Sequence, residues 1–282
     1  MNSNQSGTLY VVATPIGNLA DMVPRAVHTL QSVSVIACED TRHSKKLLEH
    51  FSINTPCIAY HDHTHQKSAY KILNRLADGD DVALISDAGT PLISDPGYRL
   101  VAQARNQDIP VIPIPGACAA ISALSVSGLP TDKFRFVGFL PAKSTQRQKV
   151  LETLKSVPDT LVFYEAPHRI CAALNDLLEV FGSERIAFIA REISKTFETY
   201  LYGTIEELLV QVSADSNQQR GEIVLVLAGN TASDEKLSAD AEKILKLLIK
   251  ELPLAKAASL AAKITGGDKK QLYQLALTLQ NK

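Results

Sequence analysis

The sequence has little of the material from which secreted and base-stacking proteins are built. It has no tryptophan and only 6% aromatic residues, so recognition of RNA bases by stacking is not favoured. The four cysteines stand singly, with no Cys-x-x-Cys pair, which argues against a zinc knuckle and a disulfide scaffold and favours a reducing compartment. The first seven residues carry no charged side chain, and the apolar stretch after them is too short for a signal-peptide core. We therefore expect a cytoplasmic protein.

Long hydrophobic runs are also missing. Residues 109–131 carry no charge, but four prolines and two glycines interrupt this stretch. Such residues break a membrane helix, so the pattern predicts a strand, a turn and a helix of small residues, with no membrane span.

Net charge is close to zero, at −1, which gives no overall nucleic-acid signature. The distribution is uneven, however, because residues 236–282 contain nine lysines against four acidic residues. If the protein binds an anionic partner, we expect this basic tail to touch it.

The hydrophobic pattern predicts an α/β protein of two domains and a helical tail. In the first domain, residues 1–127, short apolar runs alternate with helical segments, which indicates a mainly parallel sheet covered on both faces. The expected strands are 9–13, 33–38, 82–86 and 111–114, and the expected helices are 25–30, 44–51, 67–77, 98–106 and 117–125.

A second α/β set is expected over residues 128–231, after Gly128, Pro130 and Asp132 interrupt the chain. Its predicted strands are 134–139, 160–164, 185–190 and 223–227, and its predicted helices are 146–156, 169–181 and 205–211.

The tail, residues 236–282, is rich in lysine, leucine and alanine and predicts three short helices at 242–251, 254–264 and 269–279. A glycine turn joins the last two, which is typical of a helix-turn-helix unit. The charge and the hydrophobic pattern favour this interpretation and a second one equally, in which the tail is a helical hairpin that caps a dimer or packs on another domain.

Three turns rich in small residues follow predicted strands. The first turn, residues 14–19, reads Thr-Pro-Ile-Gly-Asn-Leu and stands at the carboxyl end of the first strand, where open α/β sheets bind ligands. It lacks the Gly-x-Gly-x-x-Gly pattern of nicotinamide and flavin sites.

The acidic loop, residues 86–97, reads Ser-Asp-Ala-Gly-Thr-Pro-Leu-Ile-Ser-Asp-Pro-Gly. Two aspartates, two glycines and two prolines in twelve residues predict two tight turns that present carboxylates and backbone groups to one cleft. The structural alternative is a turn in which Asp95 caps the following helix, and it leaves residues 87–91 without a role.

The third turn, residues 113–120, opens a helix of small residues, so a ligand could lie against its backbone amides. Within it, Cys118 has no base or charge beside it in sequence, and we interpret it as a small buried hydrophobe.

Together the three turns resemble the tetrapyrrole-methylase superfamily. Six further segments resemble the branch of this superfamily that modifies 16S ribosomal RNA, and the resemblance covers essentially all of residues 8–282. These segments are residues 37–42, 60–63, 138–141, 163–169, 190–195 and 221–224.

The resemblance implies two α/β domains with S-adenosylmethionine bound in the cleft between them, and a homodimer. It also implies methyl transfer to a cytidine 2′-hydroxyl in the decoding region of 16S rRNA, in the assembled small ribosomal subunit. The residues that it places at the cofactor are Pro15, Gly17, Asp87, Ala88, Gly89, Pro91, Gly116, Ala117, Ala120, Glu165 and Glu222. Two departures from the small-molecule members are a first turn without the acidic Gly-x-Gly-x-Gly-Asp form, and Ser-Asp-Ala-Gly where they have Gly-Gly-Asp.

Methyl transfer to a hydroxyl is helped by a group that takes its proton. Among acidic and histidine side chains that follow predicted strands, we favour Asp40 as base or orienting group, with Arg42 steering phosphate. The other candidates for the base are Glu39, His61, His63, Glu165 and Glu192.

Contacts to RNA phosphates are expected from basic residues near predicted strand ends and in the tail. The alternative for each is a surface salt bridge, above all for Arg191 with Glu192. These basic residues are Arg42, Arg169, Arg191, Lys195, Lys269 and Lys270.

Alternating histidines at 61, 63 and 65 could in principle bind a metal, but no cysteine is nearby and the chemistry needs none, so no metal site is expected. Two other functions remain open: methylation of a small tetrapyrrole or corrinoid on the same fold, and a non-catalytic role in ribosome assembly. The lysine-rich tail favours RNA over a porphyrinoid, and the intact acidic loop and third turn favour an enzyme.

Overall fold

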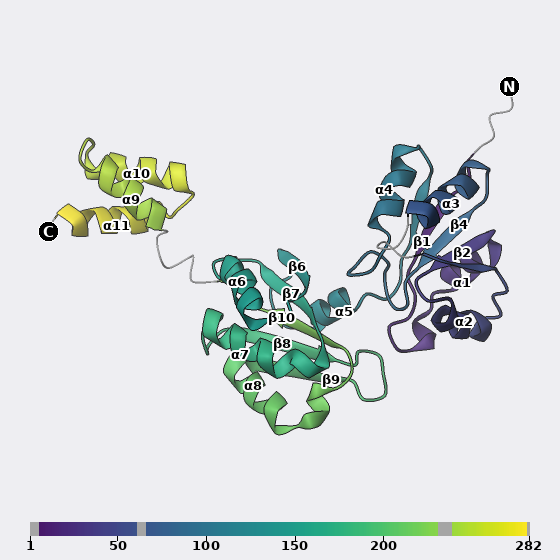
Figure 1. The fold of residues 1–282 in the computed structure, drawn as a ribbon. Helices are drawn as coiled ribbons and strands as arrows, with labels where there is room; N and C mark the ends of the chain where they lie inside the picture. The colour runs from purple at the N-terminus through teal and green to yellow at the C-terminus, as the bar shows by residue number, and fades with distance from the viewer. Residues whose placement is uncertain (1–5, 61–65, 231–238, 281–282) are drawn as a thin grey trace. The chain divides into compact units, whose positions relative to one another are not determined.

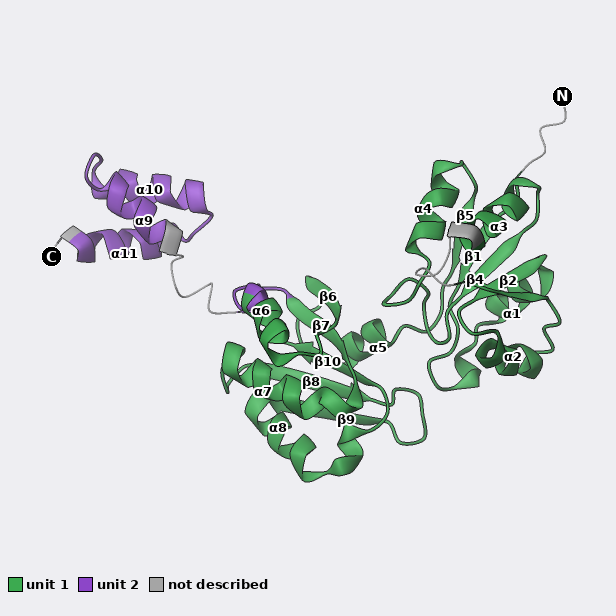
Figure 2. Ribbon diagram, in the orientation of Figure 1, with its two compact units in different colours: residues 1–152, 160–228 green, residues 153–159, 229–282 purple. Residues whose placement is uncertain are grey.

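The computed structural model describes residues 6–60, 66–230 and 239–280. Two five-stranded sheets lie in one compact unit, Met1–Glu152 with Thr160–Ala228 (Figures 1 and 2). A second unit comprises Thr153–Asp159 and Gly229–Lys282. None of the described helices is long and apolar enough to cross a membrane.

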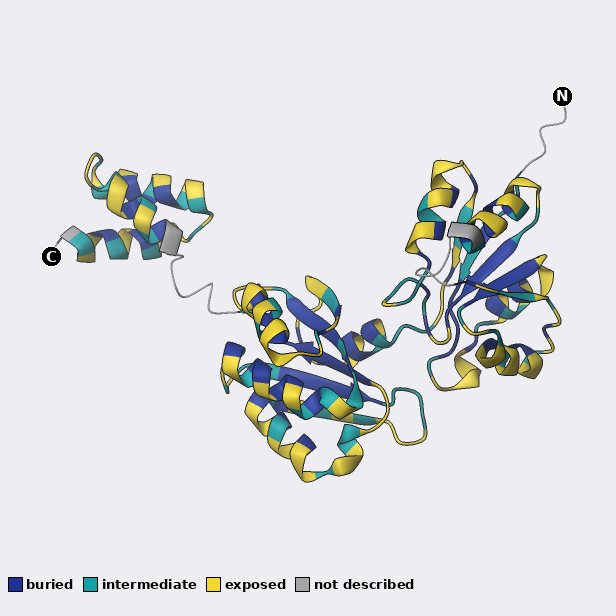
Figure 3. Cartoon of the chain, in the orientation of Figure 1, coloured by how far each residue is buried: buried dark blue, intermediate teal, exposed yellow. Residues whose placement is uncertain are grey.

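The first sheet is parallel throughout, as the alternating strand and helix pattern predicts. Its strand order is β3-β2-β4-β1-β5. Because helices cover both faces, the central strands β2 and β4 are buried at every position, which explains their unbroken apolar runs (Figure 3). The strands are β1 (Leu9–Val12), β2 (Val35–Cys38), β3 (Cys57–Ala59), β4 (Val82–Ile85) and β5 (Val111–Ile114).

Two helices cover each face of this sheet. Helices α1 (Pro24–Ser32) and α2 (Thr41–His50) pack through residues such as Leu30 and Leu48 on one face. Helices α3 (Gln66–Ala77) and α4 (Tyr98–Asn106) pack through Ile72 and Leu100 on the other. All four apolar stripes lie where the sequence predicts them.

The second sheet is mixed, with order β6-β7-β10-β8-β9, and only its β6–β7 pair is parallel. The edge strand β9 was not predicted, because its exposed residues Tyr200 and Tyr202 obscure the apolar pattern of a buried strand. The strands are β6 (Phe134–Phe139), β7 (Thr160–Glu165), β8 (Ile186–Arg191), β9 (Thr199–Thr204) and β10 (Ile223–Leu227). The accompanying helices are α6 (Ser144–Leu154), α7 (Ile170–Phe181) and α8 (Ile205–Ala214), with the 3-10 turns η2 (Pro167–Arg169) and η3 (Ser216–Gln219). A further 3-10 turn, η1 (Leu19–Asp21), lies between β1 and α1.

Helix α5 (Ala119–Val126), expected with the first domain, packs on the second sheet. Ala120 and Ala123 are buried against Val162 and Val224 of strands β7 and β10. Small side chains let this helix lie close to the sheet, but they do not specify which sheet it covers. The expected boundary at residue 127 therefore separates α5 from the sheet against which it packs.

A buried ion pair fixes α6 on α7. Arg147 and Asp176 are 3% and 7% exposed in their side chains, with Arg147 Nη2 2.6 Å from Asp176 Oδ2. Arg147 also donates to the carbonyls of Pro141, Ala142 and Ala172, so the charge is satisfied away from water.

The tail contains the three expected helices, α9 (Ala239–Leu248), α10 (Leu254–Thr265) and α11 (Lys269–Gln280). Gly266 ends α10 in the left-handed conformation at φ 70°, which a glycine adopts without steric cost. Buried alanines let the helices pack closely around Leu245 and Leu272.

Candidate active site

The first turn and the acidic loop are hydrogen-bonded to each other. Strands β1 and β4 are neighbours in a parallel sheet, so their carboxyl ends meet at one edge. There, Thr14 N donates to Gly89 O at 2.9 Å and Gly89 N donates to Thr14 O at 3.0 Å. Gly89 has φ 80°, a left-handed conformation in which a side chain is strained.

The third turn joins the same edge after β5. Thr90 Oγ1 donates to Ala117 O at 2.9 Å, which ties the third turn to the acidic loop. A Cβ atom at Gly116 would stand 2.8 Å from Ala13 Cβ, so glycine is needed for this close approach. The expectation that the three bends converge is confirmed.

The acidic loop makes the two tight turns that its composition predicts, but it does not cap the next helix. Leu92 and Ser94 have φ of 73° and 68°, and Gly97 has φ 133°. Helix α4 begins at Tyr98 after Gly97, without a side-chain cap. The alternative in which Asp95 is the N-cap is therefore wrong, because two more residues separate Asp95 from the helix.

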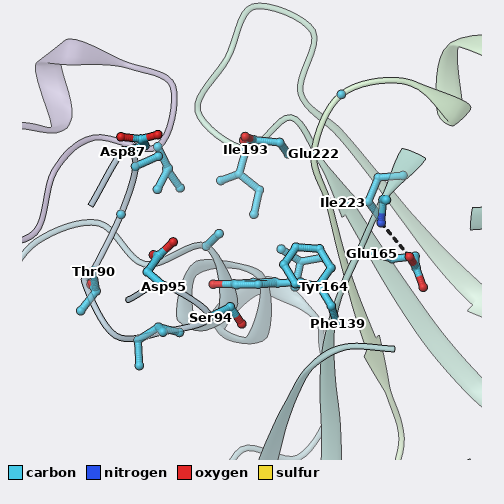
Figure 4. A pocket seen from close by; sticks show the side chains of 18 of the residues that line it. Asp87, Thr90, Ser94, Asp95, Phe139, Tyr164, Glu165, Ile193, Glu222 and Ile223 are labelled. Carbon is cyan, nitrogen blue, oxygen red and sulfur yellow. Dashed lines mark hydrogen bonds between the residues drawn. The ribbon is translucent and has the colours of Figure 1, made fainter. Parts of the chain in front are cut away.

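The turns border a pocket of about 420 Å³, within the range of ligand sites (Figure 4). Five of the residues predicted to bind cofactor line it, namely Asp87, Ala88, Gly89, Glu165 and Glu222. The other six do not line the pocket, although they stand in the same three turns as residues that do: Pro15, Gly17, Pro91, Gly116, Ala117 and Ala120.

Two carboxylates of the acidic loop line one wall of the pocket. Asp87 is exposed, and its Oδ1 accepts the backbone N–H of Asp40 at 3.3 Å. Asp95 is half-buried; burial and then the charge of Glu39 raise its pKa to about 6, although a hydrogen bond with Ser86 opposes this. A carboxyl group with such a pKa can exchange a proton near neutral pH.

Strand β7 supplies the opposite wall. Tyr164 presents its ring to the pocket, and its Oη accepts the Ala120 N–H at 3.3 Å, at the start of α5 (Figure 4). Burial, and then the charge of Cys118, raise the pKa of Tyr164 above its ordinary value, so it stays protonated at neutral pH. Phe139 of β6 packs edge-on against the Tyr164 ring, with the two ring centroids 5.6 Å apart.

Glu165 is almost fully buried beside Tyr164. Its Oε1 accepts bonds from Arg169 Nε at 2.9 Å, Arg169 Nη2 at 2.5 Å and Ala166 N at 2.7 Å. Its Oε2 has no hydrogen-bond partner in the part of the chain that the structure describes. A buried carboxylate oxygen left in this way, on a residue that lines a pocket, is consistent with a polar ligand group.

Lys195 joins the first turn to β10 at the rim of the pocket. Its Nζ lies 2.7 Å from Glu192 Oε1 and 3.0 Å from Glu222 Oε2, and its aliphatic stem occupies the space where Gly17 would carry a Cβ. Burial alone would raise the pKa of Glu192, but hydrogen bonds from Lys195 and from the Glu222 amide hold it below its ordinary value. Lys195 is thus engaged with two carboxylates rather than directed at phosphate.

The favoured base, Asp40, has a different role in the structure. Its Oδ1 accepts the amides of Arg42 at 2.7 Å and His43 at 3.3 Å, which makes it the N-cap of α2. These backbone hydrogen bonds lower the pKa of Asp40, and its side chain does not line the pocket. A capped carboxylate of low pKa is a poor proton acceptor, so the structure argues against Asp40 as the base, and its role as an orienting group stays a prediction.

Two of the predicted phosphate contacts are also corrected. Arg191 is only 8% exposed and donates to Thr199 Oγ1 and to the Phe197 and Arg220 carbonyls. Arg169 forms an ion pair with Glu165. No Arg191–Glu192 ion pair is found among the described side chains either, because the guanidinium faces the β9 end of the sheet.

The remaining predicted RNA contacts, Arg42, Lys269 and Lys270, are exposed. The candidate base His61 and the histidines at 63 and 65 lie outside the described residues. Within the described ranges no group of three or more metal-ligating side chains occurs. Among the pocket residues that the site prediction does not name are Asp95, Tyr164, Phe139 and Ile193. Asp95 lies in the acidic loop, and the other three lie in segments that carry the family resemblance.

The pocket fits S-adenosylmethionine by its chemistry. Ile16, Ile93 and Ile193 offer apolar walls for a flat adenine ring, and Asp87 and Glu222 offer negative charge to a sulfonium and an ammonium group. The left-handed glycine at position 89 keeps side-chain bulk out of the wall.

Comparisons with known proteins agree with this geometry. A family model described as Tetrapyrrole (Corrin/Porphyrin) Methylases matches residues 8–209, and a model described as RsmI C-terminal HTH domain matches residues 235–280. The protein named Ribosomal RNA small subunit methyltransferase I of Pseudomonas aeruginosa is 54% identical over 279 residues, covering 98% of this chain and 99% of that protein. The protein of the same name from Escherichia coli O157:H7 is 51% identical over 277 residues, covering 98% and 97%.

Solved structures share the fold at low identity. A uroporphyrin-III-C-methyltransferase from Thermus thermophilus matches with a TM-score of 0.56 and 19% identity, covering 79% of this chain and 94% of that one. A diphthine synthase matches with a TM-score of 0.59 and 14% identity, covering 79% and 90%. The chain therefore belongs to the tetrapyrrole methylase family and, within it, to the family of ribosomal RNA small subunit methyltransferase I.

Proposed function

We propose that the protein transfers a methyl group from S-adenosylmethionine to the ribose 2′-hydroxyl of a cytidine in the decoding region of 16S rRNA, in the cytoplasm. The observation that carries the proposal is the pocket at the three turns, in a chain that matches proteins named Ribosomal RNA small subunit methyltransferase I along almost its whole length. The substrate is the assembled small ribosomal subunit.

The bound cofactor supplies a methyl group already activated by its sulfonium, so much of the catalysis is alignment of the attacking oxygen. We assign the cofactor to Asp87, Ala88 and Gly89 on one wall and to Glu165 and Glu222 on the other. Gly17, Gly116, Ala117 and Ala120 hold the turns in shape through their close contacts and hydrogen bonds. Pro15 and Pro91 are assigned to the first turn and the acidic loop in which they stand. Tyr164 and Phe139 narrow the pocket, which helps to exclude water from the reacting atoms.

RNA binding is assigned to exposed cations. Lys269 and Lys270 stand in the first turn of α11, and Lys263 is exposed near the end of α10. Arg42 in the first turn of α2 is a further phosphate contact beside the acidic loop. These charges give a binding constant that falls with salt, because each phosphate contact releases counterions.

The proposed assembly is a homodimer. Edge strand β9 exposes Tyr200 at 45% and Tyr202 at 59%, and Phe197 just before it is 77% exposed. An aromatic sheet edge of this kind is commonly covered by a partner. Light scattering on the full chain tests this: a dimer that Tyr202→Glu converts to a monomer supports it, and a monomeric wild-type protein refutes it.

The experiment that tests the function is methyl transfer from labelled S-adenosylmethionine to small subunits from a strain without the enzyme. We expect label in one cytidine of 16S rRNA, at the ribose 2′-oxygen, and we expect the rate to fall with salt. Label on a base, on protein or in a corrinoid precursor would refute the proposal.

A further inference from the structure

A bulge in strand β6 turns Phe139 toward the pocket. Side chains alternate between the two faces of a regular strand, so residues three positions apart point to opposite faces. Phe136 and Phe139 nevertheless both contact the ring of Tyr164, with ring centroids 5.0 Å and 5.6 Å away. The pairing of β6 with β7 explains this, because its register shifts between Phe136 and Gly138. The irregularity thus adds Phe139 to the lining of the pocket.

Gly138 makes the bulge possible and brings it against the acidic loop. It has φ 76°, in the left-handed region where a side chain would be strained. A Cβ atom at this position would stand 3.2 Å from Ser94 Oγ, so the strand and the loop meet closely. Bulges beside active sites commonly re-aim a side chain, and here the re-aimed side chain is an aromatic ring.

Phe139 is held in place, yet more than half of its surface is open. The ring of Tyr164, against which it packs edge-on, is itself fixed by the hydrogen bond from the Ala120 N–H to its hydroxyl (Figure 4). Phe139 is nonetheless 57% exposed. A single exposed apolar residue is common on protein surfaces, but this ring is re-aimed by a bulge, fixed by a neighbour and placed at a pocket. These three features together indicate a contact with a ligand.

The cofactor has other apolar surface to lie against. The pocket measures about 420 Å³, near the lower end of ligand sites, which leaves room for one cofactor. Ile16, Ile93 and Ile193 offer walls for its adenine ring. The nucleotide that accepts the methyl group must therefore lie at the mouth of the pocket, where the exposed ring of Phe139 is available.

We infer that Phe139 stacks on the base of the cytidine whose ribose is methylated. This inference rests on the proposed function. Unpaired RNA bases are commonly held against the faces of aromatic side chains. A base held in this way also fixes its ribose through the glycosidic bond, so that the 2′-oxygen is aligned with the methyl group. The low aromatic content argues against a surface that stacks several bases, but one ring is enough for one base.

The test compares Phe139→Leu with wild type in the full-length protein, on small subunits from a strain without the enzyme. Leucine keeps an apolar side chain and removes the aromatic face. We expect the KM for small subunits to rise about tenfold, within the range that stacking of one base contributes. Because the stack is present both before and during transfer, kcat and the Kd for S-adenosylhomocysteine should each stay within about threefold of wild type.

Two further variants separate stacking from packing. Phe139→Tyr keeps the aromatic face, so its KM should stay within about threefold of wild type. Phe134→Leu is the matched control, because Phe134 is 43% exposed on the same strand but precedes the bulge and does not line the pocket. It should leave KM, kcat and Kd unchanged.

Photocrosslinking gives a readout that does not depend on activity. With p-benzoylphenylalanine in place of Phe139 and S-adenosylhomocysteine added, irradiation in the presence of small subunits should crosslink the protein to 16S rRNA. Primer extension should map the crosslink to the methylated cytidine or to the nucleotide beside it. The same photoreactive residue in place of Phe134 should not crosslink to that cytidine.

The outcomes separate the inference from the function on which it rests. If Phe139→Leu weakens S-adenosylhomocysteine binding about tenfold and leaves the KM for small subunits unchanged, the ring contacts the cofactor and the inference is wrong. It is also wrong if Phe139→Leu matches wild type in every constant, or if Phe139→Tyr is as impaired as Phe139→Leu. If wild type modifies no rRNA, the proposed function itself fails, and the inference fails with it.

Discussion

A single methyl group at Gly89 tests whether the three turns form the cofactor site. Gly89 has φ 80° and makes both hydrogen bonds to Thr14 that hold the first turn against the acidic loop. A Cβ atom there would stand 3.2 Å from Ile16 Cγ2 and 3.7 Å from Ala117 O. Gly89→Ala thus strains the backbone and presses against Ile16 of the first turn, while the distance to Ala117 O is an ordinary contact.

The magnitude follows from these two effects. A left-handed conformation costs a non-glycine residue about 1–2 kcal/mol, which lowers Tm by roughly 2–4 °C per kcal/mol in a protein of this size. The contact with Ile16 requires a shift of the turns by a few tenths of an ångström. If this shift weakens the free energy of cofactor binding by about 1.4 kcal/mol, the Kd for S-adenosylhomocysteine rises about tenfold.

Gly182→Ala is the matched control. Gly182 ends α7 with φ 86°, and a Cβ atom there would meet nothing within 4 Å. Thermal unfolding should show a loss of stability in both variants, whereas calorimetry should show weaker cofactor binding for Gly89→Ala only. Equal affinity in the two variants would refute the claim that these turns hold the cofactor.

Two further predictions concern other regions of the molecule. Arg147→Ala leaves Asp176 buried without its partner, and we expect urea denaturation to show a loss of about 3–5 kcal/mol, whereas Lys45→Ala at the exposed pair with Glu49 should cost less than about 1 kcal/mol. Similar losses for both would contradict the role given to burial. Replacing Lys269 and Lys270 by alanine should reduce the slope of log K for RNA binding against log salt concentration by about one per lysine, and should leave cofactor affinity unchanged. Asp87→Ala should instead weaken cofactor binding about tenfold. Filter binding and calorimetry measure the two effects, and the reverse pattern would overturn the assignment of the two regions.

Four of the five strands of the first sheet could be predicted because they are short apolar runs, and the tail because its helices have clear apolar stripes. The edge strand β3 could not, because it has only three residues and none of them is fully buried. The edge strand β9 and the partner of α5 could not. In β9 the exposed Tyr200 and Tyr202 hide the pattern, and the small residues of α5 suit either sheet equally well.

The site was predicted at the level of turns but not of roles. Asp95 has the residue type of a helix cap, but α4 begins three residues after it, whereas Asp40 directly precedes α2 and does cap it. Arg191 ends a strand that lies between two others, so its side chain is enclosed by neighbours that sequence alone does not reveal. The proton affinity of Asp95 depends on Glu39, which is distant in sequence and comes close only through the β2–β4 pairing.

Hydrogen exchange of the full chain, with and without S-adenosylhomocysteine, tests most directly whether the cofactor binds at the turns. We expect slower exchange in residues 86–91, 116–120 and 222–224, with no change in α10 and α11. Protection confined to the tail, or to the shallow hollow lined by Val27, His28 and Phe51, would contradict the account.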